Sequence, residues 1–301
     1  MDFDAFAGCV SSAACIVSQV TNGLIIGMLL FLVASGLTLI FGVLKVVNFA
    51  HGSLYMLGAY FALVAYKASG SYALAALAAV AGVALFGALL ERLFISRVYK
   101  QEFLMQLLMC YGWVLVLDDA VKLIFGAEFQ SMGMPPTFAV APVFIAGTPV
   151  PPFYMFLIGT AFAVAVCVWL LIEKTSYGKK VRAAAVNPSM TGALGVNTTL
   201  LQVSVFALGA ALAGMAGGLA APVRSLVPGM GLSILIESFI VTVIGGMGSI
   251  WGALVASILI GLTRAFGSYA FPLFTEGLVF VLMAVVLVVR PQGLFGKEEG
   301  R

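Results

Sequence analysis

Apolar residues run along this chain in long windows, separated by short polar or glycine-rich stretches. A helix of roughly 20 apolar residues spans the hydrocarbon core of a bilayer, which is about 30 Å thick. We expect eight or nine such spans, at residues 18–43, 46–66, 71–95, 103–125, 152–172, 200–221, 232–246, 250–267 and 273–290. Lipid offers backbone amides no hydrogen-bonding partner, and continuous apolar runs lack the alternation of barrel strands. The pattern therefore predicts an all-α, polytopic transmembrane helix bundle.

The window at residues 232–246 is short, and the glycine cluster GGMGS follows it at residues 245–249. Glycine weakens a helix interior, so a broken or re-entrant helix fits this region as well as two full spans. The longest polar stretch, residues 173–200, has the length of one short hairpin. Because this leaves no room for a soluble catalytic domain, residues 1–301 are expected to form a single transmembrane domain.

Composition supports a membrane protein and argues against an enzyme. Hydrophobic residues make up 62% of the chain and charged residues 9%, which no water-soluble domain could hide in one core. No GxxxxGK[ST] phosphate loop occurs, and GKK at residues 178–180 lacks the glycine and hydroxyl that such a loop needs. The only histidine, His51, has no partners at metal-ligand spacing. We therefore expect no catalytic residue, no metal site and no cofactor on this chain.

Lysine and arginine predict which loops face the cytoplasm, because cytoplasmic loops carry an excess of both. The basic clusters are Arg92, Arg97 and Lys100; Lys174, Lys179, Lys180 and Arg182; and Arg290, Lys297 and Arg301. The loop at residues 126–151 holds five prolines and no basic residue, so it is expected in the periplasm, and the loop at 174–199 in the cytoplasm. Nine crossings would place the N-terminus in the periplasm and the C-terminus in the cytoplasm. Lys67, Arg224 and Arg264 fall on the wrong side of this arrangement.

The cysteines and the small residues both favour structural interpretations. Cys9 and Cys15 could pair in an oxidising periplasm, but two free thiols on a short helix is the interpretation we favour.

In the window 206–221, alanine and glycine recur four residues apart, as in Ala210 with Gly214. Small side chains let helices approach closely in lipid, so this window predicts a tight helix-packing face.

Charged side chains inside the spans are few, and burying them in lipid is costly. Lys122 follows Asp118 by four residues and Asp119 by three, which favours a helical ion pair over an ion or proton relay through the two carboxylates. Glu237 and Glu276 are isolated acids near outward span ends, and we expect them to be solvated or paired.

The stretch VVNFAHGSLYMLGAY at residues 46–60 places Asn48, His51 and Ser53 between apolar runs. If residues 46–66 form a helix, Asn48, His51 and Tyr55 share one stripe. A structural hydrogen-bond knot joining the first two helices is one interpretation, and a polar step in a transport path is the other.

The loop at residues 174–199 contains the signals of a short helix. TSYGKKVRAAA at residues 175–185 is a basic lead-in. Asn187 can cap a helix whose first turn holds Pro188, and Gly195 with Asn197 can end it. A cytoplasmic helix of roughly two turns is therefore predicted, either docking a partner or resting on lipid headgroups.

Several stretches resemble one family in order along the chain. GLIIGMLLFLVASGLTLIFGVLKVVNFAHGSLYMLGAY at residues 23–60 closely resembles the opening segment of permease subunits of branched-chain amino-acid ABC importers, the LivH type. The resemblance continues through TSYGKKVRAAAVNPSMTGALGVN (175–197), FALGAALAGMAGGLAAP (206–222), GGMGSIWGALVASILIGL (245–262) and VRPQGLFG (289–296). It implies a multi-pass protein of the bacterial inner membrane that imports a small solute, most simply a branched-chain or related amino acid.

The resemblance also implies partners. They are a second permease subunit in a homo- or heterodimer, two ATP-binding subunits that hold ATP and Mg²⁺, and a periplasmic solute-binding protein, with no nucleic acid. Gly178, Asn187, Pro188 and Gly195 would belong to the coupling helix that meets the ATPase, although Ser189, Met190 and Thr191 lack the acidic residue of the usual pattern. Permeases similar to this one also carry urea, amides or organic acids. An ATP-independent channel or secondary transporter is the alternative from another class.

Overall fold

The computed structural model describes residues 8–9, 11–99 and 101–296, so the basic residues Lys100, Lys297 and Arg301 lie outside the described residues. All nine apolar windows form helices: α2 (Ala13–Leu44), α3 (His51–Ser69), α4 (Tyr72–Leu93), α5 (Phe103–Phe125), α6 (Pro152–Lys174), α9 (Thr198–Ala220), α10 (Met230–Gly245), α11 (Ile250–Ala270) and α12 (Thr275–Val289). The remaining elements are short: η1 (Ile95–Arg97), η2 (Pro136–Phe138), α7 (Ser176–Val186), α8 (Pro188–Ala193), η3 (Pro272–Phe274) and an antiparallel hairpin of β1 (Val143–Ile145) and β2 (Thr148–Val150).

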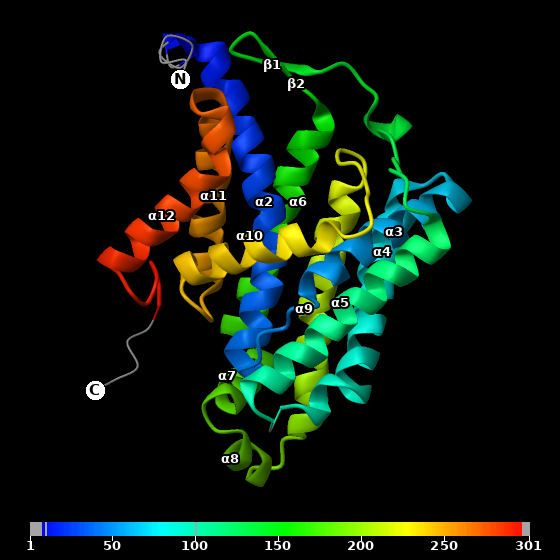
Figure 1. Cartoon of the computed structure of the whole chain (residues 1–301), viewed down its shortest axis with the longest axis vertical. Helices are drawn as coiled ribbons and strands as arrows, with labels where there is room; N and C mark the ends of the chain where they lie inside the picture. Colours follow the sequence, from blue (N-terminus) through cyan, green and yellow to red (C-terminus); the bar gives the residue numbers. More distant parts are fainter. Residues whose placement is uncertain (1–7, 10, 100, 297–301) are drawn as a thin grey trace.

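Six of the described helices are long and apolar enough to cross a bilayer. They are α2, α4 continued through η1, α6, α9, α11, and α12 extended by η3. The chain is therefore a multi-pass helical membrane protein. Helix α10 is shorter, and Figure 1 shows it lying across the long axis of α2. Its 16 residues rise about 24 Å, less than the hydrocarbon thickness, and the turn at Gly246–Ser249 separates it from α11.

Helix α2 forms the centre of the bundle, and residues 27–40 are buried without interruption. It packs against α9, α10, α11 and α6. Position 36 is a glycine because both the backbone of Gly209 in α9 and the imidazole of His51 in α3 occupy the space of a side chain there. This close approach holds three helices together at the middle of α2.

The predicted packing face at residues 206–221 is confirmed. Gly214 lies against the Ala79 carbonyl and the Val83 side chain of α4, and Gly217 lies against the backbone of α3 at Tyr55 and Ala59. Helix α9 is therefore seated between α3 and α4 with almost no side chain between the backbones, as expected where dispersion rather than water drives association.

The two ends of the molecule differ. The N-terminal end of α2 and the 126–151 loop lie at one end, and α8 lies at the other (Figure 1). The loop is tied down, because Thr148 Oγ1 donates to the Ala14 carbonyl at 2.8 Å and the backbones of Gln130 and Leu226 exchange two hydrogen bonds at 2.9 Å.

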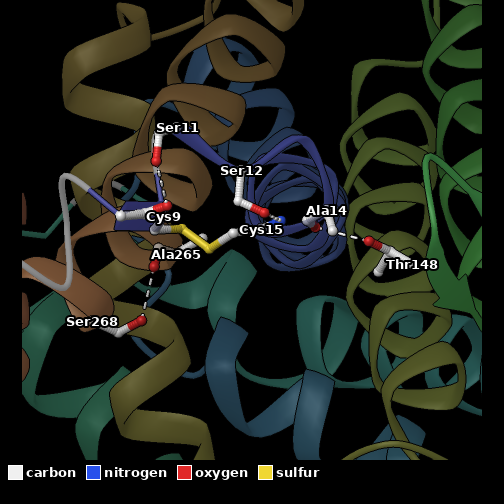
Figure 2. Close-up of a disulfide and its surroundings, with 9 residues drawn as sticks. Cys9, Ser11, Ser12, Ala14, Cys15, Thr148, Ala265 and Ser268 are labelled. Carbon is white, nitrogen blue, oxygen red and sulfur yellow. Dashed lines mark hydrogen bonds between the residues drawn. A yellow bond between two sulfur atoms is a disulfide. The ribbon is translucent and has the colours of Figure 1, made fainter.

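The interpretation of Cys9 and Cys15 as free thiols was wrong. The two residues form a disulfide at the start of α2, with Cα atoms 5.2 Å apart (Figure 2). Ser12 caps α2, since its side chain accepts from the Cys15 amide at 3.5 Å, and its own amide donates to the Cys9 carbonyl at 3.0 Å. Cys110 and Cys167 are free.

Candidate functional site

The segment between α6 and α9 contains the predicted short helix. The Asn187 side chain accepts from the Met190 amide at 2.9 Å, Pro188 occupies the first turn of α8, and Gly195 ends the segment with φ +85°, a conformation that favours glycine. Asn197 acts differently from the expectation, because its side chain accepts from the Leu200 amide at 2.9 Å and thereby starts α9.

The basic lead-in is itself a helix, α7, and it is firmly anchored. Val181 and Ala184 pack in a hydrophobic cluster, separate from the main core, that combines residues of α2, α6 and α9; its other buried members are Leu39, Val168, Ile172, Leu201, Val205 and Leu212. Arg182 donates to the Ile172 carbonyl and pairs with Glu173 at 3.4 Å. The Tyr177 hydroxyl lies 3.0 Å from Ser204 Oγ of α9. Helix α7 is therefore packed directly against three of the long helices.

Gly178 lies inside the corner between α6 and α7 rather than on the outer surface. It is buried, and a side chain there would collide with the backbone of Ile172. Its amide donates to Thr175 Oγ1 at 3.2 Å, which caps α7. The residue thus determines how closely α7 crosses the end of α6.

Helix α8 presents a short apolar stripe to its surroundings. Met190 in α8 and Leu194 at its C-terminal cap lie four residues apart and are 62% and 79% exposed, and Val186, the last residue of α7, is 88% exposed. Exposed apolar groups arranged together commonly mark interaction sites, and α8 is the part of the molecule farthest from the 126–151 loop (Figure 1).

The polar segment around His51 differs from its expected form. Helix α3 begins at His51, so Asn48 lies before the helix and not on a shared stripe. The Asn48 side chain accepts from the Ala50 amide at 3.0 Å, and its carbonyl accepts from the His51 amide at 3.1 Å. A side chain that bonds to nearby backbone in this way competes with helix formation, which explains the later start of α3.

His51 joins the first two of the predicted spans, α2 and α3. Its Nε2 lies 3.0 Å from the Val33 carbonyl of α2, and because a carbonyl only accepts, Nε2 carries the proton. No hydrogen bond joins the Asn48 and His51 side chains among the described residues. Asn48 Nδ2, His51 Nδ1 and Ser53 Oγ are buried without a hydrogen-bond partner, so this part of the core retains unused polar groups.

Replacing His51 with alanine is expected to destabilise the bundle by about 2–4 kcal/mol, through loss of the Val33 hydrogen bond and the cavity left beside Gly36. Thermal unfolding of the detergent-purified protein measures the effect. His51→Gln, which can retain a donor, should recover part of it, and Ser69→Ala on the exposed end of α3 serves as control. Equal melting temperatures for wild type and His51→Ala would contradict the assigned role of this contact.

The acidic residues in the spans are mostly paired. Lys122 binds Asp119 at 3.2 Å, which confirms the helical ion pair for this carboxylate, whereas Asp118 has a buried oxygen without a hydrogen-bond partner. Glu237 and Glu276 both pair with Arg264, at 2.7 and 3.8 Å. The Arg264–Glu237 pair is largely buried, with side chains 20% and 15% exposed.

A cavity of about 530 Å³ adjoins this ion-pair network. It lies among the N-terminal half of α2, the start of α6, the connection between α9 and α10, and the segment from the end of α11 to the start of α12. Its polar lining consists of Gln19, Asn22, Tyr154, Arg224, Arg264, Ser268, Thr275 and Glu276. Sequence reasoning missed this cavity, although Arg224 and Arg264, the arginines on the wrong side of the charge rule, were a signal.

Comparison with known proteins gives concordant matches. The family described as branched-chain amino acid transport system / permease component matches residues 19–289. The high-affinity branched-chain amino acid transport system permease protein BraD of Pseudomonas aeruginosa is 31% identical, covering 93% of this chain and 96% of its own. LivH of Escherichia coli K12 is 28% identical over the same shares. A chain of PsaBC from Streptococcus pneumoniae, solved in complex with Fab, has a similar fold, with a TM-score of 0.50, 11% identity and coverage of 96% of this chain and 95% of that chain.

Proposed function

Because the chain belongs to the family of branched-chain amino acid transport permease components, we propose that it moves branched-chain or related amino acids from periplasm to cytoplasm as the permease of an ATP-driven importer. The chain contributes the passage, and energy enters through partner subunits. In this proposal two ATP-binding subunits hold ATP and Mg²⁺, a second permease subunit completes the pore, and a periplasmic protein delivers the solute.

The α7–α8 segment carries the proposal. An ATPase-docking element needs an exposed surface that a partner can grip and a rigid connection to the spans. The exposed stripe of Met190 and Leu194, together with the exposed Val186 at the end of α7, supplies the first, and the packing of α7 on α2, α6 and α9 supplies the second. Asn187, Pro188 and Gly195 give α8 its shape, and Gly178 sets the angle of α7. Closure of the ATPases on ATP would then move these spans as a rigid unit.

The proposal includes an orientation in the bacterial inner membrane. The N-terminus would lie in the periplasm and the C-terminus in the cytoplasm, with residues 1–301 as one transmembrane domain. The disulfide supports this, because the periplasm is oxidising and the cytoplasm is reducing. The 126–151 loop lies at the disulfide end, whereas α7, with Lys179 and Lys180, lies near the other end.

The polar segment of Asn48, His51 and Ser53 has two roles in this proposal. The His51 contact joins α2 to α3, and the unpartnered polar atoms beside it offer hydrogen bonds to a solute or to water during transport.

Reconstitution tests the proposed function. The chain is purified with its proposed partners, the ATPase, the second permease and the binding protein, and uptake of radiolabelled L-leucine into proteoliposomes is measured. We expect ATP-dependent uptake that stops when the catalytic glutamate of the ATPase is changed to glutamine. Leucine flux through this chain alone would instead identify a channel or secondary transporter. ATP-dependent uptake of urea, an amide or a dicarboxylate but not of leucine would place the protein among permeases for those solutes.

A further inference from the structure

The lining of the cavity beside Arg264 carries two arginines, Arg224 and Arg264, and one glutamate, Glu276. Arg264 forms ion pairs with Glu237 and Glu276. Arg224, which lines the same cavity, has no ion-pair partner among the described residues. Glu276 makes the longer contact and its side chain is 86% exposed, so it is the carboxylate more easily released to another cation. One guanidinium and one carboxylate in this cavity are therefore available to a ligand.

The remaining lining is suited to a small apolar side chain. The apolar part of the lining includes Ile25, Ile26 and Leu29 of α2, together with Val223. Pockets for small molecules usually measure about 300–1,000 Å³ and combine apolar walls with a few polar groups. A volume of about 530 Å³ accommodates an amino acid with some of its water.

We infer that this cavity is a substrate-binding site for a zwitterionic, apolar amino acid, with Arg224 binding the carboxylate and Glu276 the ammonium group. The inference rests on the proposed function and specifies where this chain meets its substrate. Arginine is well suited to the task because its planar guanidinium binds a carboxylate through two parallel hydrogen bonds. A sugar would make no use of the opposite charges, and a dicarboxylate would meet Glu276 unfavourably.

The cavity lies at the end of the molecule that the binding protein would approach. Figure 2 shows Ala265 and Ser268 of α11, both lining residues, beside the Cys9–Cys15 disulfide. At its inner edge the cavity reaches Leu29 of α2, one helical turn from Val33, whose carbonyl accepts the hydrogen bond from His51.

The test removes one charge from the protein and the matching charge from the ligand. The complete importer is purified, and binding of L-leucine, leucinamide (without the carboxylate) and 4-methylpentanoate (without the ammonium) is measured in the absence of the binding protein. We expect Arg224→Gln to weaken leucine binding at least tenfold and to leave leucinamide unchanged. Glu276→Gln should weaken leucine at least tenfold and leave 4-methylpentanoate unchanged. Arg97→Gln, an exposed arginine outside this cavity, is the matched control.

Complex yield and melting temperature show whether each variant folds, and Arg224→Lys, which keeps the charge, should retain part of the leucine affinity. Equal loss of leucine and leucinamide in Arg224→Gln would overturn the assignment of the carboxylate. Unchanged leucine binding in both variants, with a wild type that transports leucine, would overturn the site and leave the proposed function standing. A wild-type importer that transports no amino acid would overturn both.

Discussion

Replacing Gly217 with leucine is expected to prevent assembly of the bundle. Gly217 of α9 lies against the backbone of Tyr55 and Ala59 in α3, and a Cβ at this position would lie 2.7 Å from the Ala59 nitrogen. Backbone cannot rotate away as a side chain can, so α9 must move out from between α3 and α4. Overpacking typically costs about 1–3 kcal/mol, and we expect a cost at or above the upper end. Yield and melting temperature after membrane extraction measure it.

Gly159 provides the matched control. It lies within α6, another apolar helix, and an added Cβ there meets no atom within 4 Å. Gly159→Leu should therefore preserve both the yield and the melting temperature. Comparable losses in Gly159→Leu and Gly217→Leu would attribute the effect to glycine replacement in general and contradict the close approach of α9 and α3.

Introducing aspartate at both Met190 and Leu194 is expected to separate the permease from its ATPase. These residues form the exposed apolar stripe at α8, and the few residues that dominate an interface cost about 2 kcal/mol or more each when they are removed. We expect at least a hundredfold loss of ATPase affinity, which corresponds to about 2.7 kcal/mol, together with loss of ATP-dependent uptake. Copurification of the ATPase and its affinity for the reconstituted permease measure the change.

Thr199→Asp controls for added charge on the same side of the molecule. Thr199 is exposed in the first turn of α9, where a carboxylate is favourable for the helix dipole. This variant should keep ATPase binding and uptake. Full ATPase binding by the Met190→Asp and Leu194→Asp double variant would exclude the stripe as the docking surface and favour a helix that rests on lipid headgroups.

The helices were predictable from the sequence because the length of an apolar run is a local property. The cap of α8 was predictable for the same reason, since Asn187, Pro188 and Gly195 act within one short segment. The start of α3 was not predictable in this way. The Asn48 side chain forms a hydrogen bond to the adjacent backbone, which prevents an earlier helix start, and the apolar pattern contains no signal for this bond. The sequence also did not predict that the basic segment before α8 forms a helix of its own, α7, because α7 packs against the distant helices α2, α6 and α9.

The cavity depends on tertiary structure to a still greater degree. Arg224 lies in the connection after α9, Arg264 near the end of α11 and Glu276 at the start of α12. In the sequence each reads as an isolated charge, and only the fold brings them together. The disulfide was similarly ambiguous, because the spacing of Cys9 and Cys15 allowed them to pair but did not require it.

Helix α2 runs without a break from Ala13 to Leu44, so its two ends move together as one rigid rod. Gln19 lines the cavity and Leu39 belongs to the cluster that holds α7, and the intervening residues separate the two positions by about 30 Å along the helix axis. A tilt of about 5° about one position would displace the other by about 3 Å, with no change in helix geometry. A small rotation driven from the α8 end can therefore alter the width of the cavity at the disulfide end.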